Sequence, residues 1–114
     1  IRLILAVGAD DRVIGVRVIS HKETPGLGDY IDPKKDRNKA SPWIRQFDAR
    51  GFGEVAAADW KVSKDGGRFD ARAGATISAR AVTHAVRRAL QFAVDQRDKL
   101  YSLPAQSALQ KETP

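Results

Sequence analysis

A long amphipathic pattern in the C-terminal part of the chain constrains the fold most. From Ala79 to about Asp98, apolar residues recur at helical spacing, and the polar residues fall largely on the opposite face. The apolar stripe consists of Ala81, Val82, Ala85, Val86, Ala89, Leu90, Ala93 and Val94. The opposite face carries Arg80, Thr83, His84, Arg87, Arg88 and Gln91. Because alanine allows backbones to approach closely, we expect this helix to pack directly on a sheet.

The first 19 residues predict a β-hairpin. Residues 1–7 and 13–19 are rich in aliphatic and β-branched side chains, and the residues between them have turn chemistry. In the second strand Ile14, Val16 and Val18 are expected to share one face. Gly15 is expected to mark a bulge or a close backbone approach.

The middle of the chain predicts a short helix and a second hairpin. Ser41 and Pro42 have the character of an N-cap and a first helical residue, followed by Trp43, Ile44 and Phe47 on one face. Strands are expected over 59–64 and 68–72, joined by the turn at residues 65–67. Residues 32–40 are expected to form a solvated connection, and 102–114 a frayed or disordered tail. These elements predict an α+β fold, a small single domain with antiparallel β-hairpins packed against a long C-terminal amphipathic helix.

Composition restricts the function classes. The chain has 114 residues, enough for one small domain. It contains no cysteine and two histidines, which excludes a disulfide framework or a thiolate metal site, and no metal ligand is assigned. Its net charge of +6 suits nucleic acid, an anionic membrane surface or an acidic protein, but no nucleic-acid-binding motif accompanies the charge. No apolar run approaches the ~18 to 20 residues that span a bilayer. Since the chain starts without Met, we expect it to be a fragment.

The stretch from Asp70 to Ser78 is the most informative one for function. It places Thr76 on a turn of small residues directly before the long helix, where Gly74 and Ala75 leave room for a large group. Ser78 is expected to be the N-cap of the helix. A phosphate esterified to the threonine hydroxyl would face the positive end of the helix.

A second motif lies upstream, at residues 21–28, with the sequence His-Lys-Glu-Thr-Pro-Gly-Leu-Gly. Pro25 presets a turn, and Gly26 is expected to take the positive φ that a type II turn requires. The loop is therefore predicted to be compact and rigid.

The two motifs together resemble the FMN-binding domain family shared by RnfG (RsxG) and NqrC. The resemblance rests on Asp-x-x-x-Gly-Ala-Thr at 70–76 and His-x-Glu-Thr-Pro-Gly-Leu-Gly at 21–28, in the order that the family uses. It extends over most of residues 1–100 and favours the RnfG type. It continues through Gly15-Val16-Arg17-Val18, Trp43-Ile44 before Phe47, Gly66-Gly67 with Phe69-Asp70, and Ala81-Val82. The sequence departs from the family at Ala73, where serine or threonine is usual.

The resemblance implies a covalent cofactor. FMN would be joined through its phosphate to Thr76 by an ApbE-type flavin transferase that uses FAD and Mg²⁺. The recognition segment would be Asp70, Gly74, Ala75 and Thr76. The expected cofactor-binding residues are Thr76, Glu23, Thr24, Gly26, Leu27, Gly74, Ala75, Ser78 and Lys61. In this interpretation Leu27 packs on the flavin ring, Thr24 bonds its edge, and Lys61 is a cation that favours a reduced, anionic flavin.

The resemblance also implies a domain organisation, a protein complex and a location for the chain. Residues 1–100 would be the FMN-binding domain and 101–114 a C-terminal tail, within the RnfG-type electron-transfer component of an Rnf-type ion-translocating oxidoreductase. This component would have no catalytic residue and no turnover of its own. Its partners would be the other Rnf/Rsx subunits, the flavin transferase and the inner membrane, through an N-terminal helix outside this sequence, with the domain on the periplasmic side.

Two other classes stay open. The chain could be a non-redox binding module on the same fold, or a basic nucleic-acid-binding domain. A flavin that survives denaturation separates the first interpretation from both, because only a covalent cofactor does so.

Overall fold

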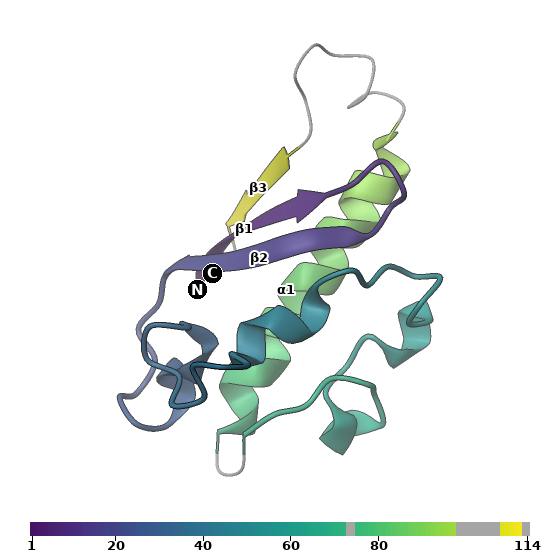
Figure 1. The fold of residues 1–114 in the computed structure, drawn as a ribbon. Coiled ribbons are helices and arrows are strands. Elements are labelled where there is room, and N and C mark those ends of the chain that lie inside the picture. Colours follow the sequence, from purple (N-terminus) through teal and green to yellow (C-terminus); the bar gives the residue numbers. More distant parts are fainter. Residues whose placement is uncertain (73–74, 98–107, 113–114) are drawn as a thin grey trace.

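A three-stranded antiparallel sheet lies against one long helix (Figure 1). The structure is a computed structural model that describes residues 1–72, 75–97 and 108–112. The strands are β1 (Arg2–Val7), β2 (Val13–Ser20) and β3 (Ala108–Glu112), in the order β2-β1-β3. Helix α1 (Thr76–Asp95) crosses one face of the sheet. The predicted α+β class and the first hairpin are confirmed.

The hairpin contains the irregularity expected beside Gly15. Ala6 pairs with Gly15 but Val7 pairs with Val13, so the register shifts between these two positions. Because a shift of one residue exchanges the two faces of a strand, Val13 is buried and Ile14 is 63% exposed. The prediction that Ile14 shares a face with Val16 and Val18 was therefore wrong.

Helix α1 buries most of the predicted stripe. Val82, Ala85, Val86, Ala89, Leu90 and Ala93 are all buried against the sheet and the connecting segments. Two positions differ from the prediction, since Ala81 is exposed and Thr83 is buried. At 100° per residue, Ala81 lies about 140° from Val86, the centre of the buried face, whereas Thr83 lies about 60° from it.

The predicted second hairpin does not form. Residues 57–72 contain a single isolated bridge, between Val62 and Phe69, and the short helices η3 (Ala57–Asp59) and η4 (Ser63–Asp65). The bridge is parallel, and residues 63–65 form η4, which ends at Gly66 with φ +88°, so the antiparallel ladder of a hairpin does not form. The alternation that predicted a strand instead reflects Trp60 and Val62, which both point into the core.

Two more short helices lie between β2 and this region, η1 (Gly28–Ile31) and η2 (Trp43–Phe47). The predicted short helix is confirmed as η2, but Ser41 is not its N-cap. Pro42 holds that position without a side-chain cap, and the Trp43 N–H instead donates to Asp36 Oδ2 at 2.7 Å. The N–H group at the start of η2 is therefore hydrogen-bonded to an acid in the connecting segment before Pro42.

The tail also differs from the sequence prediction. Residues 108–112 form β3, in which Leu109 lies opposite Leu5 of β1. Without β3, the backbone groups on this side of β1 would lack a strand partner, which is a reason for the segment to pair there. The remainder of the expected tail lies outside the described residues. In the described part of the chain, no helix is both long and apolar enough to cross a membrane.

Aromatic side chains fix the middle segments to one another. Phe47 stacks on Trp60 with ring centroids 6.2 Å apart, and Phe69 contacts both rings. Trp43, 5% exposed, meets Phe47 edge to face and continues the cluster to Tyr30 of η1. The cluster holds residues 28–47 beside residues 60–72.

Thr83 provides a test of the core. Its side chain is fully buried, and its hydroxyl has no hydrogen-bond partner among the described residues. Thr83→Val replaces that hydroxyl with a methyl group of similar size, so we expect the free energy of unfolding to rise by about 1 kcal/mol. Urea unfolding of both proteins measures the difference. A clear loss of stability would show that the hydroxyl has a partner.

Candidate functional site

The start of α1 and the loop of residues 21–28 meet around one depression. Its volume is about 260 Å³, and its walls come from both segments. The lining residues are Lys22, Glu23, Thr24, Leu27, Gly28, Ala75, Thr76, Ile77 and Ser78. Two motifs that are far apart in the sequence are thus neighbours in the fold.

The loop and the helix touch at Gly28 and Ser78. A Cβ on residue 28 would lie 2.1 Å from Ser78 Oγ, so only glycine permits this approach. The buried Ser78 hydroxyl donates to the Glu23 carboxylate. The prediction that Ser78 is the N-cap was wrong, because the helix begins two residues earlier, at Thr76, and Ala75 holds the cap position.

The loop has the predicted turn. The Leu27 N–H donates to the Thr24 carbonyl at 3.0 Å, and Gly26 has φ +78°, as a type II turn requires. This turn leaves the Leu27 side chain 54% exposed at the rim of the depression. The loop is therefore compact and presents an apolar side chain to the site.

Ile77 was missed by the sequence reasoning. It is 78% exposed and, with Leu27, lines the depression that contains Thr76. The signal in the sequence was an aliphatic residue in the first turn of α1 that is out of phase with the buried stripe. Exposed apolar side chains in such a depression are suited to contact with an aromatic ring.

The N-terminus of α1 is suited to an anion. Thr76 is the first residue of a 20-residue helix whose first turn contains no acidic side chain and whose N-cap makes no side-chain hydrogen bond. The N–H groups of this turn carry the positive end of the helix dipole. Lys22, on the wall of the depression, adds a cation. The Glu23 carboxylate lies on the same wall, where the Ser78 hydroxyl donates to it. The groups of this depression that favour a phosphate ester on Thr76 are therefore the helix N-terminus and Lys22.

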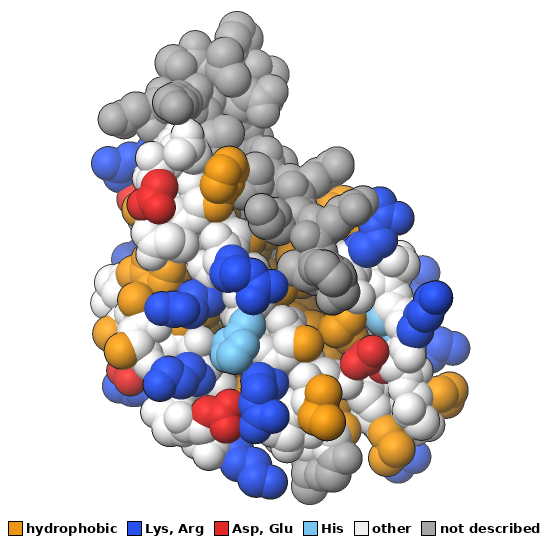
Figure 2. Space-filling model, turned by 180° about the vertical axis from the view of Figure 1, so that it is seen from behind, with side chains coloured by type: hydrophobic (Ala, Val, Ile, Leu, Met, Phe, Trp, Pro, Cys, Tyr) orange, Lys and Arg blue, Asp and Glu red, His pale blue; other side chains and the backbone are white. Residues whose placement is uncertain are grey.

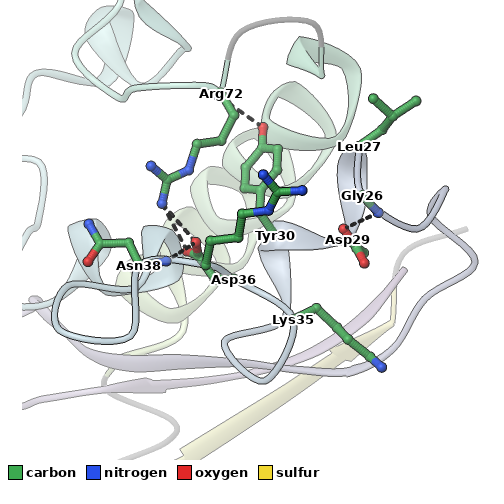
Figure 3. Close-up of a pocket in the computed structure, with 9 residues that line it drawn as sticks. Gly26, Leu27, Asp29, Tyr30, Lys35, Asp36, Asn38 and Arg72 are labelled. Carbon is green, nitrogen blue, oxygen red and sulfur yellow. Dashed lines mark hydrogen bonds and ion pairs between the residues drawn. The ribbon is translucent and has the colours of Figure 1, made fainter.

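An ion pair between the buried Asp36 carboxylate and the half-exposed Arg72 guanidinium holds the segment that leads to Thr76. Arg72 Nη2 lies 2.9 and 3.0 Å from the two carboxylate oxygens of Asp36, which is 2% exposed (Figure 3). The backbone N–H groups of Trp43 and Asn38 also donate to this carboxylate. The prediction that residues 32–40 are a solvated connection was wrong at Asp36, whose partner lies 36 residues away in the sequence.

The electrostatics of this carboxylate follow from its partners. Burial acts to raise the pKa of Asp36, but the N–H groups of Trp43 and Asn38 and the Arg72 guanidinium outweigh it. The pKa of Asp36 is therefore below its usual value, and the side chain is ionised at neutral pH.

Tyr30 connects the same segment to the helix. Its hydroxyl donates to the Ala75 carbonyl at 2.7 Å and accepts the Arg72 N–H at 3.3 Å. Burial raises the pKa of Tyr30 above its ordinary value, so the hydroxyl keeps its proton and acts as a donor. Tyr30, Asp36 and Arg72 line a second pocket of about 450 Å³, which shares Leu27 with the first depression.

The remaining predicted site residues lie in different places. Gly26 lines the second pocket. Asp70 is exposed, and its backbone N–H and carbonyl are bonded to the Gln46 side chain, with Trp43 Nε1–H donating to the same carbonyl. Lys61 is not among the described residues around the Thr76 depression. Gly74 lies outside the described residues.

Figure 2 shows the molecule from behind. Most of the charged side chains visible on this face are basic, and a few acidic side chains lie among them. On α1, Arg87 and Arg88 are exposed, and Arg80 pairs with Asp65 at 2.7 Å. These exposed charges on α1 are solvated, and salt screens them beyond ~8 to 10 Å.

Asp36→Asn tests the buried pair. At pH 7 we expect the substitution to lower the free energy of unfolding by about 2 kcal/mol, because a charged acceptor of three donors becomes neutral. Since the folded-state pKa of Asp36 is lowered, its contribution is present above the unfolded value of about 3.9 and disappears as pH falls through the folded value. Urea unfolding should therefore show a smaller difference in the free energy of unfolding between wild type and Asp36→Asn at pH 3 than at pH 7.

Asp65→Asn is the matched control. It breaks the exposed pair with Arg80, and a surface ion pair contributes little. Equal losses in the two variants at pH 7 would contradict the special role of the Asp36 pair.

Comparison with known proteins gives one family and a set of relatives. Residues 1–91 match the family described as FMN-binding domain. The G subunit of the ion-translocating oxidoreductase complex of Pseudomonas aeruginosa strain UCBPP-PA14 is 49% identical over 100 residues, covering 88% of this chain and 44% of that protein. The proteins of the same name from Aliivibrio fischeri and Stutzerimonas stutzeri are 44% and 46% identical, covering 47% and 38% of their lengths and 91% and 81% of this chain. The chain spans less than half the length of these curated relatives.

Proposed function

Because this chain belongs to the FMN-binding domain family, we propose that it carries FMN joined through its phosphate to Thr76 Oγ1 and acts as an electron-transfer domain. The observation that carries the proposal is the position of Thr76. It is the first residue of α1, within a depression built by the two motifs of the sequence. The acceptor hydroxyl and the expected ring-contacting loop are thus parts of one site.

The residues at this site fit FMN. The first-turn N–H groups of α1 and Lys22 would hold the phosphate, and the exposed Leu27 side chain would pack on the flavin ring. The Thr24 hydroxyl would bond the polar edge of the ring. When bound, FMN supplies reversible uptake and release of electrons. The protein's contribution is to bind it and to set its surroundings.

Attachment is proposed to be a phosphoryl-type transfer from FAD. Thr76 Oγ1 would form a bond to the phosphorus of the FMN half, the pyrophosphate bond of FAD would break, and AMP would leave. Glu23, the acid beside Thr76, already accepts the Ser78 hydroxyl. We therefore assign removal of the threonine proton to a flavin transferase of the ApbE type, with Mg²⁺, rather than to this chain.

The relatives suggest where such a domain works. Their names describe the G subunit of an ion-translocating oxidoreductase complex. We propose that this chain is the corresponding part of such a protein, with the other subunits of the complex as its electron-transfer partners. From the resemblance of its two motifs to this family, we further propose that the domain lies on the periplasmic side of the inner membrane, anchored by a helix outside this sequence. The basic face of α1, through Arg87 and Arg88, is suited to docking on acidic partners or anionic lipid.

Thr76→Ala tests the attachment. After co-expression with a flavin transferase, wild-type protein should gain one FMN by intact mass and fluoresce as a denatured band, and the variant should do neither. Thr76→Ser should keep the flavin, since it preserves the hydroxyl. Thr83→Ala is the matched control, because its hydroxyl is on the same helix but buried. Covalent flavin on Thr76→Ala, or none on the wild type, would refute the proposal.

Substitutions in the loop test the ring contacts. Leu27→Ala and Thr24→Ala should shift the absorption spectrum and reduction potential of the attached flavin without releasing it, because the ester at Thr76 depends on neither side chain. Ile19→Ala, an exposed aliphatic residue on β2, is the control. Unchanged spectra and potentials in both loop variants would place the ring elsewhere.

A further inference from the structure

The segment before Thr76 is held by side chains of η1 and η2. The Asp70 carbonyl accepts hydrogen bonds from Trp43 Nε1–H and from Gln46 Nε2, and the Asp70 N–H donates to Gln46 Oε1. At the other end of the segment, the Tyr30 hydroxyl contacts the backbone of Arg72 and Ala75. The acceptor threonine therefore follows a segment whose two ends are fixed by η1 and η2.

Tyr30 makes the more informative of these contacts. Its hydroxyl bridges the Arg72 N–H and the Ala75 carbonyl, and the Ala75 N–H closes the turn by donating to the Arg72 carbonyl at 3.1 Å. Ala75 is the N-cap of α1, directly before Thr76. One phenol group thus fixes both the turn and the point at which the helix begins.

The Tyr30 side chain is itself held in place. The Arg72 guanidinium lies 5.8 Å from the centre of the Tyr30 ring, and the buried Asp36 carboxylate fixes that guanidinium. The Trp43 ring packs edge to face on Tyr30 at 5.4 Å. In Figure 3 the Tyr30 hydroxyl points to the backbone of Arg72, and Leu27 lies on the other side of the ring from Asp36.

Tyr30 also belongs to the element that follows the loop. Helix η1 begins at Gly28, and Leu27 is its N-cap. The same side chain therefore connects the loop that presents Leu27 to the turn that presents Thr76. The distance between the Thr76 hydroxyl, where the flavin would be attached, and the Leu27 side chain at the rim of the depression depends on this connection.

We propose that Tyr30, supported by the Asp36–Arg72 pair, is a positioning residue of the flavin site: it fixes Thr76 relative to Leu27 and so sets the environment of the attached ring. This inference rests on the proposed function. It concerns the surroundings of the flavin and not its attachment, because the phenol contacts the backbone around the acceptor and leaves the side chains of the recognition segment unchanged. Preorganisation of this kind limits the motion of a bound group.

Tyr30→Phe tests the inference, since it removes the hydroxyl and keeps the ring. In the unmodified protein we expect the amides of Arg72 and Ala75 to exchange roughly fivefold faster or more, because the Arg72 N–H loses its acceptor and the Ala75 N–H closes the turn that the phenol bridges. In the flavin-carrying protein, intact mass should show the FMN retained. The fluorescence anisotropy of the flavin should decay faster than in wild type, and its reduction potential should shift.

Arg80→Gln is the matched control. It breaks an ion pair made by the first turns of α1 on the exposed side, and should leave amide exchange at Arg72 and Ala75, flavin anisotropy and reduction potential unchanged. If Tyr30→Phe fails to fold, Arg72→Gln is measured in its place. It breaks the ion pair with Asp36 that supports Tyr30. Amide exchange, flavin anisotropy and reduction potential should change in the same direction as in Tyr30→Phe.

The possible results distinguish failure of the positioning role of Tyr30 from failure of the proposed function. A Tyr30→Phe protein that is less stable but has wild-type exchange at Arg72 and Ala75, wild-type anisotropy and wild-type potential would overturn the positioning role and leave a purely structural one. Loss of the flavin from Tyr30→Phe would also overturn it, by showing a role in attachment. Absence of flavin from wild type would refute the proposed function, and the exchange measurement would still decide whether Tyr30 holds the helix start.

Discussion

The close packing of Gly28 against Ser78 is the constraint on which the site depends. Because no side chain fits at residue 28, the loop lies directly on the first turn of α1, and Glu23 reaches the Ser78 hydroxyl. The alanine-rich face of α1 lies on the sheet, which fixes the direction of the helix. The site is the place where a rigid turn meets the end of a firmly packed helix, and its geometry follows from the packing.

Burying the polar groups beside this contact costs free energy unless they are hydrogen-bonded, and Asp36 and Tyr30 both have partners. Asp36 receives two backbone N–H groups and a guanidinium, and Tyr30 both donates and accepts. Isolated buried charge would destabilise the fold, whereas a paired and hydrogen-bonded one specifies a single arrangement. Here the arrangement that it specifies is the position of Arg72 and of Ala75, the residue before Thr76. Stability and site geometry are supplied by the same contacts.

The sequence predicted the parts of the fold that depend on local patterns. The first hairpin, the long helix and the turn at Gly26 follow from periodicity and from residue types with defined backbone preferences. The second hairpin failed because alternation at Trp60 and Val62 reports burial and not strand pairing. Periodicity also cannot show that residues 63–65 form the short helix η4 within the expected strand.

The site could be predicted where its motifs are contiguous and not where it is assembled from distant residues. Thr76, Leu27 and Glu23 came from motifs, whereas Asp36 and Tyr30 have partners 36 to 45 residues away that no local pattern reveals. The most direct measurement of the central claim is fragment mass spectrometry of the tryptic peptide 73–80 from protein matured with a flavin transferase, which contains both Thr76 and Ser78. The account predicts FMN on Thr76 alone. FMN on Ser78, or an unmodified peptide from protein that is otherwise flavinylated, would contradict it.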